Sequence, residues 1–206
     1  MKKRNIVAVA CLAIFLTACD LSLNFTCISS VFPFYTDKDT VFEPQLLGTW
    51  QDKDQTNDVE EWTFEQTTNK SYQFTIVDDN KSAKFDAHLF RLGQSQFLDL
   101  TPSECKYDAK QSEMVALFLI PGHLVLQVEQ IAPDLKMAWL NFDWLESFVT
   151  NNPAALAHQK ESDRLILIAD TPALQKFLVE HSNTNELFSH FGTLIRSKRK
   201  PATKSQ

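Results

Sequence analysis

The stretch from Val59 to Leu92, VEEWTFEQTTNKSYQFTIVDDNKSAKFDAHLFRL, carries the clearest information about the fold. Apolar and polar residues alternate in it with a period of two, which is the pattern of strands with one buried face. It divides into three strands, Val59–Gln66, Tyr72–Val77 and Ala83–Leu92, and Asp78-Asp79-Asn80-Lys81 is a hairpin turn. Because short connections join antiparallel neighbours, the stretch predicts a β-meander.

Further strands flank this stretch on both sides. We expect six more, at Leu46–Asp52, Gln96–Leu100, Met114–Ile120, Leu124–Ile131, Leu135–Leu140 and Leu165–Ala169. Because most of these strands follow one another through short connections, we predict a mainly β fold. Its antiparallel meander of eight or nine strands would form a barrel or near-barrel.

Two amphipathic helices are predicted late in the chain. Asp143 and Glu146 have the spacing of a capping box, with Asp143 as the N-cap of the first helix. Thr171-Pro172 is typical of a capping residue followed by proline in the first turn of the second helix. Apolar residues then recur at helical spacing, so we expect the second helix to lie against the barrel.

The N-terminus has the pattern of a secretory signal. Lys2, Lys3 and Arg4 precede the uncharged, largely apolar run Ile6–Thr17. A helix of that length is too short to cross a bilayer of about 30 Å, so the run is typical of a signal peptide.

This run ends in Leu16-Thr17-Ala18-Cys19, which resembles the lipobox of bacterial lipoproteins. The resemblance implies cleavage between Ala18 and Cys19, a lipid on the Cys19 thiol, and membrane anchoring in the bacterial cell envelope. Asp20 favours the inner membrane facing the periplasm, with the outer membrane as the alternative. The other interpretation of these residues is an ordinary signal peptide in which Cys19 is incidental.

These features divide the chain into four parts. We expect a signal peptide at residues 1–18, a lipidated cysteine and tether at 19–43, a single β-rich domain at 44–192, and a basic, disordered tail at 193–206. The tether contains several aromatic residues, so part of it should pack on the body.

Composition and charge exclude other classes of protein. Hydrophobic residues make up 44% of the 206 residues and charged residues 22%, which excludes a disordered or low-complexity chain. Without residues 1–18, the chain would have 17 basic and 26 acidic residues and a net charge of −9. No basic patch interleaved with aromatics offsets this charge, so we expect no nucleic-acid partner.

Cys27 and Cys105 are the cysteines that remain once Cys11 is removed with the signal peptide and Cys19 carries the lipid. In an oxidising compartment they could pair, and a disulfide closing so long a loop would stabilise the fold by roughly 4 kcal/mol. Two unpaired thiols are the other interpretation, because sequence does not establish distance.

Gly48-Thr49-Trp50 resembles the Gly-x-Trp signature of the lipocalins, calycin barrels that bind apolar ligands. The resemblance implies that Trp50 lies on the first strand and closes the base of the barrel. It also implies an arginine near the end of the last strand that stacks on this tryptophan. Arg164 does not match that arginine, because it lies at the start of its predicted strand.

A set of aromatic residues on the predicted strands is the candidate ligand pocket. Its members are Trp50, Trp62, Phe64, Tyr72, Phe74, Phe85, Phe97 and Trp139. They could line a cavity for a lipid or another apolar molecule, or they could fill a small barrel completely.

Catalytic and metal-binding patterns are not found in the sequence. The five histidines lack the spacing of a zinc site, and no nucleophile motif or glycine-rich phosphate loop occurs. His88 and Asp86 would share one face of a strand and could form a general acid–base pair, but an exposed sheet face shows the same pattern and is the favoured interpretation. We therefore expect a non-enzymatic protein without cofactor or metal that binds an apolar or amphipathic small molecule. The alternative is an accessory or assembly factor that contacts another envelope protein.

Overall fold

The computed structural model describes residues 27–53, 61–78, 81–103, 121–161, 163–184 and 186–197. The signal peptide, the lipobox with Ala18 and Cys19, and the predicted strand Met114–Ile120 lie outside the described residues. Those expectations therefore stay predictions.

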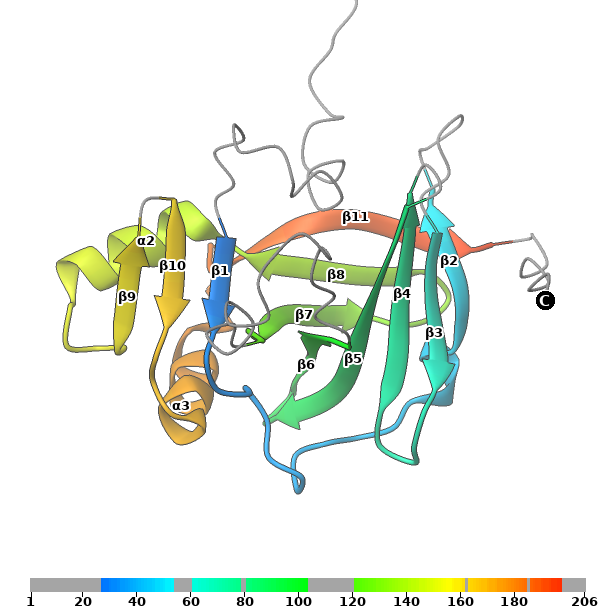
Figure 1. The fold of residues 1–206 in the computed structure, drawn as a ribbon, viewed down its shortest axis with the longest axis horizontal. Coiled ribbons are helices and arrows are strands. Elements are labelled where there is room, and N and C mark those ends of the chain that lie inside the picture. Colours follow the sequence, from blue (N-terminus) through cyan, green and yellow to red (C-terminus); the bar gives the residue numbers. More distant parts are fainter. Residues whose placement is uncertain are drawn as a thin grey trace, which may run out of the picture.

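Eight strands form a closed antiparallel barrel (Figure 1). They are β2 (Gly48–Asp52), β3 (Glu61–Gln66), β4 (Tyr72–Asp78), β5 (Lys81–Leu92), β6 (Ser95–Pro102), β7 (Leu124–Gln130), β8 (Leu135–Leu140) and β11 (Phe188–Arg196). Each strand pairs with the next, and β11 closes the barrel between β8 and β2. The predicted mainly β fold class is confirmed.

The register places the predicted apolar faces together inside the barrel. Trp62 on β3 pairs with Trp50 on β2 and with Ile76 on β4, and Phe64 pairs with Phe74. The alternation in the sequence therefore gave the correct face of each of these strands, because a slip by one residue would have turned every side chain outwards.

The strand that closes the barrel was not predicted. The expected basic tail begins at residue 193, whereas β11 continues to Arg196. The pairing of β11 with β8 shifts register between His190 and Gly192, which interrupts the period-two pattern. The basic residues that follow make the end of this strand look like a solvated tail in the sequence.

A second layer lies beside the barrel (Figure 1). It contains the three-stranded sheet β1-β10-β9, with β1 (Cys27–Ser30), β9 (His158–Glu161) and β10 (Arg164–Leu167), and the helices α2 (Phe142–Asn151) and α3 (Thr171–His181). Along the chain, α2, β9, β10 and α3 are all inserted between β8 and β11. The strand predicted at Leu165–Ala169 therefore exists as β10, but it belongs to this outer sheet and not to the barrel.

The segment expected to be a tether is part of the fold from Cys27 onwards. β1 pairs in parallel with β10, and Phe34 is only 1% exposed. The chain then passes along β5, where the Val41 amide donates to the Leu89 carbonyl, and reaches the 3-10 helix η2 (Pro44–Leu46). The described part of the tether thus packs on the body, and β1 extends the folded part to the N-terminal side of the expected boundary at residue 44. A strand of only four residues is too short to produce a readable alternation.

Both predicted helices are present, but each is capped by a different residue. The Asn141 side chain, and not Asp143, accepts from the Trp144 amide at the start of α2. The Asp170 side chain caps α3 by accepting from the Ala173 amide. Thr171 is the first helical residue, and its hydroxyl donates instead to the Pro33 carbonyl at 2.7 Å.

Two hydrophobic cores result from this architecture. One fills the barrel, and the other lies between the barrel wall and the outer layer. Phe97 belongs to the second core, where its ring lies 5.4 Å from Phe90 and 5.9 Å from Phe188. Its expected place in a pocket inside the barrel is therefore wrong. Four consecutive residues of β6, Phe97–Leu100, are buried, so alternation could not identify the inner face.

Candidate functional site

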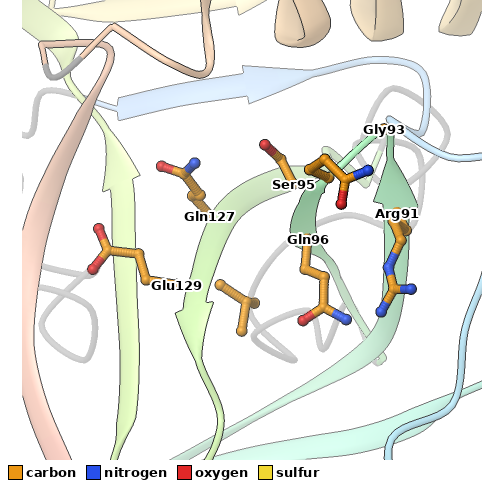
Figure 2. Close-up of a pocket in the computed structure, with 8 residues that line it drawn as sticks. Arg91, Gly93, Ser95, Gln96, Gln127 and Glu129 are labelled. Atoms are coloured by element: carbon orange, nitrogen blue, oxygen red, sulfur yellow. The ribbon is translucent and has the colours of Figure 1, made fainter.

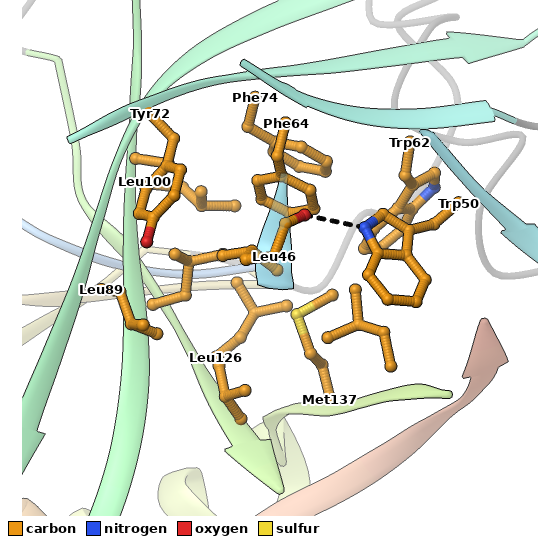
Figure 3. Packing of buried hydrophobic residues seen from close by; sticks show 14 of the residues in the cluster. Leu46, Trp50, Trp62, Phe64, Tyr72, Phe74, Leu89, Leu100, Leu126 and Met137 are labelled. Carbon is orange, nitrogen blue, oxygen red and sulfur yellow. Dashed lines mark hydrogen bonds between the residues drawn. The ribbon is translucent and has the colours of Figure 1, made fainter. Parts of the chain in front are cut away.

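One end of the barrel is closed by a plug. Trp50 is fully buried, and its indole Nε1 donates to the Leu46 carbonyl of η2 at 2.9 Å (Figure 3). The guanidinium carbon of Arg196 lies 3.8 Å from the centroid of the Trp50 ring. The same guanidinium donates to the carbonyls of Leu47 and Gln45. Arg196 thereby connects β11, β2 and η2.

Gly48 makes this arrangement sterically feasible. Its φ is +110°, and a Cβ at this position would lie 2.6 Å from the Arg196 guanidinium. A larger residue would therefore be strained and would collide with the arginine. The sequence pointed to Gly48 and Trp50 but to no matching arginine, and the structure places Arg196 over the Trp50 ring. The apolar pair Leu194-Ile195 before Arg196 was the signal that could have located the last strand.

The fold class follows from this geometry. The closed eight-stranded antiparallel barrel is compatible with a lipocalin-like fold. The chain matches no protein-family model, no curated protein and no solved structure.

Six of the predicted pocket aromatics lie together inside the barrel and are at most 9% exposed: Trp50, Trp62, Phe64, Tyr72, Phe74 and Phe85. Phe64 and Phe74 stack at a centroid distance of 4.5 Å, and Trp62 meets Phe74 edge-on at 5.2 Å. Figure 3 shows Leu46 among these side chains. The part of the interior beside the plug is therefore occupied by the protein's own side chains.

The opposite end of the barrel has a different rim. β2 begins at the plug, and successive strands of the barrel run in opposite directions. The first residues of β5 and β7 and the last residues of β8 therefore lie at the end opposite the plug. Ala83, Leu124 and Trp139 occupy these positions, and they are partly buried hydrophobic residues packed against the interior core. This end, called the open end below, presents partly exposed apolar side chains among its described residues, including the eighth predicted aromatic, Trp139.

A polar cluster lies on the outer wall of the barrel. Asp99 on β6 is 1% exposed, and its carboxyl accepts from the Phe34 amide at 2.9 Å. His123 Nδ1 lies 2.7 Å from the other oxygen of that carboxyl and 2.9 Å from the Thr101 hydroxyl. The His123 backbone also pairs with Ser30. Asp99 therefore ties the N-terminal segment and the start of β7 to the barrel.

The aromatic neighbours of this cluster have perturbed ionisation. The Tyr35 ring stacks on His88 at 4.5 Å. Burial, reinforced by the Asp99 carboxyl, raises the pKa of Tyr35 to about 12. Burial lowers the pKa of His88, although the carboxyls of Asp99 and Asp86 oppose this shift. Burial thus favours the neutral forms of both Tyr35 and His88.

A recess of about 530 Å³ lies at the margin of the plugged end, where β5, β6 and β7 meet (Figure 2). Its lining residues are Arg91, Gly93, Gln94, Ser95, Gln96, Gln127, Val128 and Glu129. These side chains are mostly charged or amide groups, and none belongs to the predicted aromatic set. The recess could hydrogen-bond a polar molecule, but its chemistry does not suit the apolar ligand expected from the sequence.

The remaining site predictions concern cysteines and metals. Cys27 begins β1, whereas Cys105 lies outside the described residues, so their pairing stays a prediction. Within the described part of the chain, no cluster of three or more His, Cys, Asp or Glu side chains could hold a metal ion. The helices in that part include none with the length and hydropathy needed to cross a membrane.

Proposed function

We propose that this protein is a lipid-anchored lipoprotein of the bacterial cell envelope that binds an apolar or amphipathic small molecule at the open end of its barrel. It performs this role without catalysis. The observation that carries the proposal is the asymmetry of the barrel, which is plugged by Trp50 and Arg196 at one end and rimmed by apolar side chains at the other. The anchor is supported by the residues Leu16-Thr17-Ala18-Cys19, and Asp20 favours the inner membrane facing the periplasm.

Packing supports the open end, rather than the plugged end, as the proposed ligand site. Emptying the space of one packed aromatic ring costs about 3–5 kcal/mol, so a ligand that displaced Phe64 or Phe74 would bind poorly. A ligand at Leu124 and Trp139 needs no such displacement, because these side chains retain exposed surface. An amphipathic ligand can bury its apolar part there and leave its polar group in water.

The experiment is a titration of the soluble form, which begins at Asp20 and lacks Cys19, with a fluorescent fatty acid. Trp139→Ala should weaken binding about tenfold, which corresponds to about 1.4 kcal/mol of lost contact. Trp144→Ala is the matched control, because Trp144 stacks on Phe148 in the outer layer, at 5.1 Å. Absence of saturable binding, or an equal loss in both variants, would refute ligand binding at the open end.

A further inference from the structure

The outer sheet has one face that the second core does not cover. Leu165 and Leu167 of β10 point into the core and are fully buried, so the residues that alternate with them, Arg164, Ile166 and Ile168, face away from it. Ile168 is 47% exposed. On the neighbouring segment, Phe32 is 44% exposed.

A backbone hydrogen bond holds the two segments together. The Val31 amide donates to the Leu167 carbonyl at 2.9 Å, immediately beyond the parallel pairing of β1 with β10. Phe32 and Ile168 are therefore presented by adjacent segments. In the described part of the chain the other large exposed hydrophobic residues are Val77 on β4 and Val179 on α3.

We propose that Arg164, Ile166, Ile168 and Phe32 form a docking surface for the phospholipid membrane that carries the anchor. The inference rests on the proposed lipidation of Cys19. Cys27, the first residue of β1, follows Cys19 by eight positions. An extended chain spans at most about 3.6 Å per residue, so the start of this sheet stays within about 30 Å of the membrane.

The chemistry of the surface fits a membrane interface. Phe32 and Ile168 can enter the boundary between headgroups and acyl chains, where apolar side chains strengthen membrane binding. Arg164 pairs in register with Cys27, at the end of the sheet where the chain leads to the anchor, and can contact anionic headgroups there. A single lipid anchor leaves the orientation of a protein free, whereas this second contact fixes it.

Hydroxyl-radical footprinting read by mass spectrometry tests the docking surface in the native chain. The mature lipidated protein in vesicles of phosphatidylethanolamine and phosphatidylglycerol is compared with the soluble form that begins at Asp20. We expect oxidation of Phe32 and Ile168 to fall severalfold on the vesicles, while Val179 and Val77 react at unchanged rates. Equal oxidation in both samples would refute docking, and so would low oxidation in the soluble form, because another segment or a second copy would then cover the surface.

The experiment distinguishes a failure of the proposed anchor from a failure of the proposed docking surface. The mass of the mature N-terminus reports lipidation of Cys19, whatever happens at Phe32. A lipidated protein without protection refutes only the docking surface, and a protein without the lipid mass refutes the anchor.

A charge-reversed pair of variants supplies a second readout. Arg164→Glu should restore most of the oxidation of Ile168 on vesicles that contain phosphatidylglycerol. Lys176→Glu is the matched control, since the Lys176 side chain is 74% exposed on α3. Protection that is insensitive to Arg164→Glu, or equally sensitive to both changes, would contradict the assigned role of Arg164.

Discussion

Arg196 is the charged residue of the plug. Its guanidinium stacks on Trp50 and donates to two carbonyls around η2, so it joins the two ends of the barrel sheet. Gly48 leaves room for it, since a Cβ there would collide with the guanidinium. The plug therefore depends on one small, one large aromatic and one cationic residue acting together.

Substitution of Arg196 tests the plug. Arg196→Ala should lower the free energy of unfolding by about 1–2 kcal/mol, because the cation–π contact and the hydrogen bonds to the carbonyls are lost together. Urea denaturation measures the change, and Arg164→Ala, at an exposed position, is the control. A stability equal to that of the unaltered protein would mean that the plug contributes nothing.

Asp99 is the buried carboxyl that attaches the N-terminal segment. Asp99→Ala leaves the Phe34 amide without its acceptor, so we expect a loss of about 2–3 kcal/mol in the free energy of unfolding. Asp86→Ala should have little effect, because Asp86 is exposed and accepts from the nearby Ser103 hydroxyl at 2.9 Å. Similar losses in the two variants by urea denaturation would contradict a specific role of Asp99.

The pKa of His88 predicts a pH dependence of stability. Burial places its pKa in the folded protein below the ordinary value of 6.5, so the unfolded chain binds the proton more readily. His88 should therefore contribute to the loss of stability as the pH falls below 6.5. His88→Gln should flatten this part of the profile in chemical denaturation. An unchanged slope would show that His88 titrates alike in both states.

At the scale of elements, alternation predicted β3, β4 and β5 closely because each has one buried and one polar face. It was less informative where both faces are buried, as in β6, and where a register shift interrupts the pattern, as in β11. β1 escaped prediction because its partner, β10, lies more than a hundred residues further along the chain. The site was predicted in part, since Trp50 was found and its partner Arg196 was not.

Hydrogen exchange tests the place of β1 in the fold. The amides of Ser30, Val31 and Phe34 donate to His123, Leu167 and Asp99, so they should exchange slowly. A free tether would exchange within seconds. Peptide-level mass spectrometry should therefore show protection of residues 28–34 comparable to that of β7, and rapid exchange of this peptide would contradict the described role of β1.

At the scale of the whole molecule, the barrel and the outer layer have separate tasks. The outer layer covers Phe90, Phe97 and Phe188 on the barrel wall, so it completes the second core. The barrel interior is packed beside the plug and presents apolar side chains at the other end. This division leaves the open end for the proposed ligand and the uncovered face of the outer sheet for the proposed membrane contact.

Ligand binding is the central proposal, and native mass spectrometry tests it most directly. The mature protein, extracted gently from its own membrane, is compared with the soluble form that lacks Cys19. We predict that both forms retain a small apolar or amphipathic molecule, which is released when the protein unfolds. A soluble form without such a molecule, together with a second polypeptide retained only in the membrane extract, would contradict the proposal and favour an accessory role through protein–protein contacts.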